Sequence, residues 1–185
     1  MDAIDAALRG EAVDLSGANP AELTALNGCP QTVTFHAEGD VAEHSRRVYE
    51  LAGEHAEKLA EPEQRQALRL AGLLHDLGKP ATTKENGPGR WSAHGHDLEG
   101  ARLVSGLFAT HPALLDLPLG VYASVHALVR AHMWTYAGER ISPGAALRLS
   151  HLSDPKLLTA CGTAILGAVS APTRISWLTG WRSPD

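Results

Sequence analysis

Apolar residues recur at helical spacing over most of the chain, which predicts a bundle of amphipathic helices. One run starts at Asp40, a suitable N-cap, and continues every three or four residues through Val41, His44, Val48, Leu51 and His55. A second run begins at Pro62, which suits a first helical turn, and extends to His75 before Gly78-Lys79-Pro80. Both helices are expected to carry histidines on their apolar faces.

Later segments predict further helices and one excursion into β structure. The expected helices are one capped by Asp97 and extending to Phe108, one over 119–132, a short one opening at Pro143, and a last one over 156–168. Residues 86–89, Asn-Gly-Pro-Gly, give a strong turn signal between Thr82-Thr83-Lys84 and Arg90-Trp91-Ser92, and predict a small hairpin within 81–94. The predicted fold class is therefore all-α, a helical bundle with one β-hairpin.

The 185 residues are expected to form one main domain. We predict a lead-in over 1–30, with an amphipathic helix in Met1–Leu15 followed by turns, a helical domain over 31–170 and an extended tail over 171–185. A composition of 44% apolar and 20% charged residues is that of an ordinary globular protein.

The net charge of −5 argues against broad adhesion to nucleic acid or to an anionic membrane, although a local basic cleft stays compatible with it. No signal peptide or long apolar span is visible, and Cys29 and Cys161 lack metal-like spacing. The expectation is a cytoplasmic protein with reduced thiols and no membrane association. The sequence does not indicate an oligomeric state.

Histidine carries the candidate chemistry, with ten copies in the chain. The adjacent pair His75-Asp76 ends an apolar run, and burying such a pair is costly unless other groups compensate. His44 and His132 lie on the apolar faces of two other predicted helices. One such histidine is usually a satisfied core residue, but three of them, one joined to an aspartate, suggest a metal site between facing helices.

These residues resemble the HD-domain metal-dependent phosphohydrolases, whose pattern H…HD…D is followed by His44, His75-Asp76 and Asp154. The segments that match most closely look like the HD domain of bacterial tRNA nucleotidyltransferases and of HD-Pnk end-healing enzymes: 35–44, 74–82, Gly89-Arg90-Trp91, Gly95-His96 and 128–132. The likeness covers about 31–167 and implies an HD-type helical bundle.

The resemblance implies a set of metal ligands. His44, His75, Asp76 and Asp154 would bind one divalent ion, and His96 and His132 would add a second ion bridged by Asp76. Imidazole with carboxylate favours Mn, Fe, Co, Ni or Zn over Mg or Ca. Several alternatives stay open: Asp154 before Pro155 also suits an N-cap, His94 competes with His96, and His126 competes with His132.

Function is implied by the same resemblance. Asp76 and Lys79 would be catalytic, with Lys79 also contacting a substrate phosphate, while His36, Glu38 and Arg130 are candidates for binding substrate. The expected activity is metal-dependent hydrolysis of phosphate esters in nucleotides or nucleic-acid ends, including 2′,3′-cyclic phosphates or 2′- or 3′-phosphates. The alternatives are hydrolysis of dNTPs or nucleoside 5′-monophosphates, and a non-catalytic module that binds a nucleotide or metal. The substrate or partner is a nucleotide or nucleic-acid end in each catalytic case.

Overall fold

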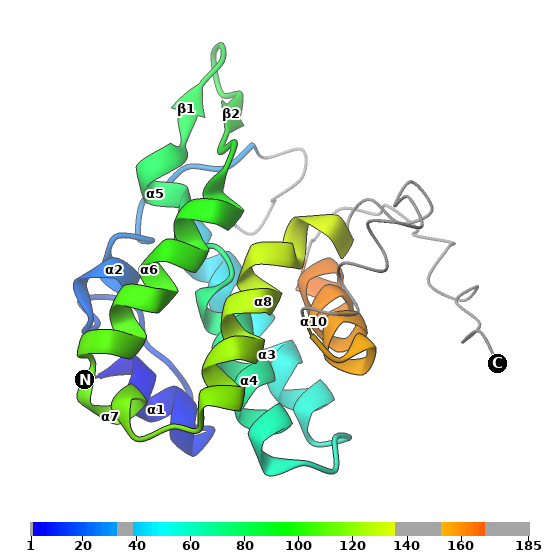
Figure 1. Ribbon diagram of the computed structural model, residues 1–185. Helices are drawn as coiled ribbons and strands as arrows, with labels where there is room; N and C mark the ends of the chain where they lie inside the picture. The colour runs from blue at the N-terminus through cyan, green and yellow to red at the C-terminus, as the bar shows by residue number, and fades with distance from the viewer. Residues whose placement is uncertain (1, 33–38, 136–152, 169–185) are drawn as a thin grey trace, which may run out of the picture.

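The computed structural model describes residues 2–32, 39–135 and 153–168 (Figure 1). The helices within these ranges are α1 (Ala3–Arg9), α2 (Ala21–Thr24), α3 (Val41–Ala56), α4 (Pro62–Leu74), α5 (Lys79–Thr82), α6 (His96–Thr110), α7 (Pro112–Leu115), α8 (Leu119–Thr135) and α10 (Pro155–Ala168). The predicted all-α class is confirmed. The helix expected at Pro143 and the tail from Ala171 lie outside the described residues.

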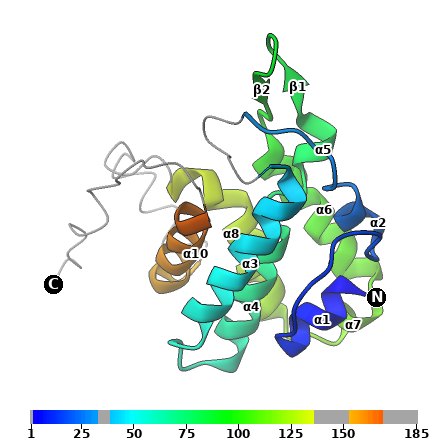
Figure 2. The same ribbon diagram turned by 180° about the vertical axis from the view of Figure 1, so that it is seen from behind.

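Helix α4 is the centre of the bundle and packs against α1, α3, α8 and α10 (Figures 1 and 2). Its side chains enter two apolar clusters, with Leu70 and Leu73 in one and Leu68 in the other. The approach of α3 depends on Gly72, because a Cβ there would lie 2.7 Å from the Cβ of Ala52. Burial on both sides holds the end of α4 rigidly inside the protein.

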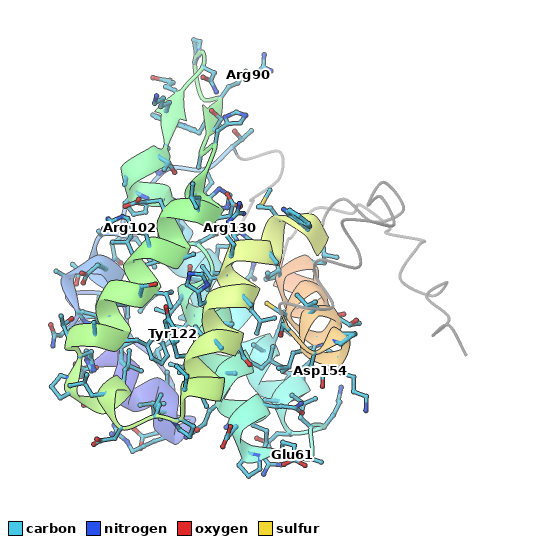
Figure 3. All side chains as sticks on the ribbon, viewed as in Figure 1. Glu61, Arg90, Arg102, Tyr122, Arg130 and Asp154 are labelled. Carbon is cyan, nitrogen blue, oxygen red and sulfur yellow. The ribbon has the colours of Figure 1, made fainter. Side chains whose placement is uncertain are left out.

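The predicted hairpin is confirmed as two short antiparallel strands, β1 (Lys84–Glu85) and β2 (Trp91–Ser92). It projects from one end of the bundle, with Arg90 beside its tip (Figure 3). The first strand begins later than expected because Thr82 belongs to α5, where its hydroxyl donates to the Gly78 carbonyl over 2.9 Å.

Two helix boundaries differ from the sequence predictions. The N-terminal helix ends at Arg9 rather than near Leu15, because Gly10 adopts a left-handed conformation with φ 71°. Helix α6 begins at His96 after Gly95, which has φ 79°, so Asp97 lies in the first turn and is not the N-cap. Leu98, in the first turn of α6, is 61% exposed. Among the described residues, no helix has the length and apolar character needed to cross a membrane.

Candidate metal centre

The end of α4 places His75 and Asp76 inside the bundle. His75 directly follows the last helical residue, and its Nδ1 lies 3.0 Å from the Gly72 carbonyl oxygen. The two side chains are 1% and 2% exposed. Such deep burial of a carboxylate requires compensating groups from the surrounding helices.

Three histidines from three other helices supply those groups. His44 lies in the first turn of α3, His96 is the first residue of α6, and His132 lies in the last turn of α8. Ring centroids are separated by 5.2 Å for His44 and His75, 5.3 Å for His75 and His132, and 4.9 Å for His96 and His132. All four contributing helix ends lie at the end of the bundle that carries the hairpin (Figure 1).

Asp76 lies between two pairs of histidines. Its Oδ2 is 3.8 Å from His44 Nε2 and 3.2 Å from His75 Nε2. Its Oδ1 is 3.4 Å from His96 Nε2 and 3.7 Å from His132 Nε2. Each carboxylate oxygen therefore faces one pair of imidazoles, and the aspartate is shared.

Backbone carbonyls fix the tautomers of three of these imidazoles. The Nδ1 atoms of His75, His96 and His132 lie 3.0, 2.6 and 2.6 Å from the carbonyl oxygens of residues 72, 93 and 129. A carbonyl can only accept, so each Nδ1 carries the proton and each Nε2 presents a lone pair toward Asp76. The Nε2 atoms of His96 and His132 are only 2.9 Å apart. Two facing lone pairs at this distance favour a cation bound between them and Asp76.

Burial and charge keep these groups in the protonation states that metal binding needs. Burial lowers the pKa of His132 to about 3, with neighbouring His75 adding to the effect, and burial also lowers the pKa of His96. Burial would raise the pKa of Asp76, but the nearby His75 and Lys79 outweigh it and hold that pKa well below the ordinary range. At neutral pH the site therefore combines the neutral imidazoles of His96 and His132 with the Asp76 carboxylate.

The donor set fits divalent transition metals. Two groups have ligand atoms within 4.8 Å of one another, His44–His75–Asp76 and Asp76–His96–His132, and every member is buried. Within the described part of the chain, the buried His75 Nε2 has no partner in hydrogen-bonding geometry, as expected where a metal would be the partner. Nitrogen with carboxylate ligation suits Zn, Mn, Fe, Co or Ni.

Close packing between the end of α4 and the start of α6 brings His96 near His75 and Asp76. Gly78, two residues after Asp76, packs so tightly on the start of α6 that a Cβ there would lie 2.2 Å from the His96 carbonyl oxygen. Gly100 on α6 completes this contact, because its own added Cβ would lie 3.4 Å from the Gly78 nitrogen. Two glycines therefore set the distance between α6 and the end of α4.

Comparison with protein families matches residues 41–155 to the HD domain. This range begins at the start of α3 and includes all five clustered residues. The chain belongs to the HD-domain family. The resemblance noted in the sequence is thereby confirmed, since both the histidine-aspartate pair at the end of α4 and the incoming histidines lie within the matched HD-domain range.

The similar curated proteins include CCA proteins and a tRNA nucleotidyltransferase, all larger than this chain. A "Multifunctional CCA protein" of Hahella chejuensis is 42% identical over 86 residues, which are 46% of this chain and 18% of that protein. One of Legionella pneumophila (strain Paris) is 29% identical over 148 residues, which are 76% of this chain and 33% of that protein. An "A-adding tRNA nucleotidyltransferase" of Deinococcus radiodurans is 45% identical over 67 residues, 36% of this chain and 14% of that protein. The chain thus spans a third or less of these relatives, and no solved structure matches it.

Lys79 lies next to the five clustered residues. Its Nζ is 2.8 Å from Asp76 Oδ2 and its side chain is 12% exposed, more than any of the five clustered side chains. The same Nζ donates to Gln31 Oε1 over 2.6 Å. Gln31 was not anticipated, because it lies in a turn-rich stretch with no periodic pattern to mark it.

Of the other residues expected to bind substrate, the structure describes Arg130. Arg130, labelled in Figure 3, forms an ion pair with Asp97 between α8 and α6. His36 and Glu38 lie outside the described residues. Of the alternatives, His94 is exposed and His126 stacks near Tyr122 with centroids 5.8 Å apart, so His96 and His132 are the histidines that reach Asp76.

The structure does not bring Asp154 to the cluster, so its interpretation as a metal ligand needs correction. Its Oδ2 accepts from Gln64 Nε2 over 3.0 Å, near the start of α4. Gln64 and His75 are separated by eleven residues, or roughly 16 Å along a helix axis. Asp154 Oδ1 accepts from the Lys156 backbone nitrogen over 2.7 Å, which is the N-cap role left open by the sequence. Figure 3 shows Asp154 on the Glu61 side of the bundle, away from Arg130.

Proposed function

We propose that this chain is a metal-dependent phosphohydrolase that acts on phosphate esters of nucleotides or nucleic-acid ends. The observation that carries the proposal is the pair of buried ligand groups sharing Asp76, His44–His75–Asp76 and Asp76–His96–His132. A carboxylate with imidazoles facing both of its oxygens is suited to two neighbouring divalent ions, an arrangement used widely for phosphoryl transfer to water.

The proposed cofactor is one or two ions of Mn, Fe, Co, Ni or Zn. His44, His75 and Asp76 Oδ2 would hold one ion, and His96, His132 and Asp76 Oδ1 the other. When bound, such ions supply Lewis acidity toward a water molecule and a phosphoryl oxygen. The carbonyl partners of the three Nδ1 atoms keep the imidazoles oriented for this role.

Lys79 provides the phosphate contact in this proposal. Its ammonium lies on the Oδ2 side of Asp76 and reaches the solvent-accessible edge of the cluster. A cation there attracts the phosphate of an ester and offsets the negative charge that grows on its oxygens during hydrolysis. The low exposure of the five cluster residues keeps bulk water away from the reacting groups and strengthens these electrostatic effects.

The names of the relatives support a more specific substrate class. They are CCA proteins and a tRNA nucleotidyltransferase, so a nucleic-acid end with a 2′,3′-cyclic phosphate, or with a 2′- or 3′-phosphate, is the substrate class that we propose. The net charge of −5 favours recognition of a short terminus over broad binding along a polynucleotide.

Hydrolysis assays on the Mn- or Ni-supplemented full chain test this function. The panel contains 2′,3′-cyclic AMP, 2′-AMP, 3′-AMP, 5′-AMP and dATP, and metal content is measured on the same samples. We expect hydrolysis of the cyclic ester and of the 2′- or 3′-phosphate. Asp76→Asn should abolish it because the shared carboxylate is lost, while Asp116→Asn, at an exposed position after α7, should retain it.

The outcomes separate the competing functions. Activity confined to dATP or 5′-AMP would refute a nucleic-acid end as the substrate, but it would support phosphohydrolase activity. Less than one bound ion per chain, together with no hydrolysis of any ester, would instead indicate a binding module without catalysis.

A further inference from the structure

Gln31 is a buried amide with one half of its hydrogen-bonding capacity unused. The residue is 7% exposed, and its Oε1 accepts from Lys79 Nζ over 2.6 Å. Its Nε2 is buried and has no hydrogen-bond partner among the described residues. An ammonium can only donate, so the amide cannot be turned around to exchange the two atoms. The unused donor therefore lies beside the Lys79–Asp76 ion pair.

The backbone around Gln31 is held on both sides. On one side, the Cys29 carbonyl accepts from the Val41 nitrogen over 3.1 Å at the start of α3. On the other side, the Thr32 hydroxyl exchanges two hydrogen bonds with the backbone of Trp91 in β2, each 2.9 Å long. The backbone that carries the amide is therefore held between the helix that carries His44 and the hairpin.

Lys79 also retains donor capacity. Two of the three N–H groups of an ammonium can be directed at Asp76 Oδ2 and Gln31 Oε1, at 2.8 and 2.6 Å, and the third remains. The remaining Lys79 donor and the Gln31 Nε2 donors thus lie on neighbouring groups joined by a hydrogen bond. The ligand that satisfies both is an anionic oxygen that only accepts.

We propose that Gln31 is a substrate-binding residue that, together with Lys79, binds a non-bridging oxygen of the substrate phosphate. This inference rests on the proposed phosphohydrolase function and adds the group that positions the phosphoryl moiety. Buried donors are nearly always paired, so an unpaired one at a reactive cluster points to a ligand that pairs it. Because the contact is to the phosphoryl group, it applies to every phosphate ester that the site accepts, whatever its base.

Gln31→Glu is the decisive variant. A carboxylate keeps the acceptor for Lys79 but removes both N–H donors and repels a phosphate oxygen. Gln31→Met removes the acceptor as well. Gln66→Glu adds the same charge in the first half of α4 and serves as the matched control. Each full-length variant is loaded with Mn, its metal content and melting temperature are measured, and its affinity for inorganic phosphate is determined by calorimetry.

We expect the wild type and Gln66→Glu to bind phosphate alike. Gln31→Glu and Gln31→Met should bind it at least about tenfold more weakly, with unchanged metal content, since one hydrogen bond to a charged group is lost. The same variants should raise KM for the accepted ester more than they lower kcat. If Gln31→Glu binds phosphate as the wild type does while Gln31→Met does not, Gln31 only holds Lys79 and the inference is wrong. If the wild type hydrolyses esters and both Gln31 variants match its phosphate affinity and KM, the role of Gln31 is refuted while the proposed phosphohydrolase function stands. If the wild type binds neither metal nor phosphate, the proposed function is refuted as well.

Discussion

Replacing Gly78 with alanine should separate the two pairs of histidine ligands. Gly78 has φ −80° and ψ −11°, values that alanine adopts readily, so the backbone conformation is no obstacle. The obstacle is the neighbouring chain, because an added Cβ would lie 2.2 Å from the His96 carbonyl oxygen and 2.6 Å from the Gly100 nitrogen. Both contacts are to backbone atoms, which cannot move aside by changing rotamer.

The required displacement is large compared with the tolerance of a metal site. Ordinary contact begins at 3.4 Å, so the start of α6 must move away from the end of α4 by about 1.2 Å. Metal–nitrogen bonds in such sites are near 2.0–2.1 Å and tolerate deviations of about 0.2 Å. His96 moves with α6, so the ion held by His96 and His132 should be lost. Overpacking of this kind costs about 1–3 kcal/mol of unfolding free energy.

Metal content and thermal unfolding of Gly78→Ala test this reasoning. We expect one fewer bound ion per chain than in the wild type and a lower melting temperature. Gly53→Ala is the matched control, because it lies within α3 and nothing is within 4 Å of its added Cβ; alanine there should leave metal content unchanged and raise stability by roughly 0.5–1 kcal/mol. Wild-type metal content together with an unchanged melting temperature in Gly78→Ala would refute the role assigned to this contact.

Three further predictions follow from the contacts of single side chains. Asp154→Ala should keep the full metal content but lower the unfolding free energy by about 1 kcal/mol in urea titrations, because it removes an N-cap; loss of an ion would reinstate Asp154 as a ligand. His44→Ala and His96→Ala should each remove one ion, measured by elemental analysis, and equal loss of both ions in either variant would argue against two separate positions. Burial opposes ionisation of Asp2, but hydrogen bonds from its own helix and from His111 outweigh it and lower its pKa. The Asp2 carboxylate therefore stabilises the fold above its unfolded-state pKa near 4, and the roughly 1 kcal/mol difference between wild type and Asp2→Ala at pH 7 should shrink at pH 3; a difference independent of pH would contradict this.

The apolar pattern predicted the helices that bury a continuous face. It thereby also predicted the candidate site residues that lie on those faces. His44, His75 and His132 lie on such faces in α3, at the end of α4 and in α8, so helical periodicity alone marks them as inward-facing. His96 follows only from the resemblance to the HD-domain family. It starts α6 because Gly95 takes a left-handed conformation, which a periodic pattern does not reveal.

Two parts of the site depend on the path of the chain and not on local pattern. Asp154 has the residue type and sequence order of a ligand, but α10 runs so that its start meets the start of α4 near Gln64. Gln31 lies in backbone without helix or strand, and its contact with Lys79 joins residues 48 positions apart. The tight packing of Gly78 on α6 likewise depends on how two distant stretches of backbone meet.

The two ends of the helical bundle differ, and this difference bears on where the chain tolerates added residues. The candidate metal ligands are confined to the helix ends near the hairpin, while the α3–α4 connection, residues 57–61, lies at the opposite end (Figures 1 and 3). Added length at that connection would leave every helix end that supplies a ligand where it is. One end of the bundle is therefore constrained by the candidate metal site, and the α3–α4 connection at the other end can lengthen without moving that site.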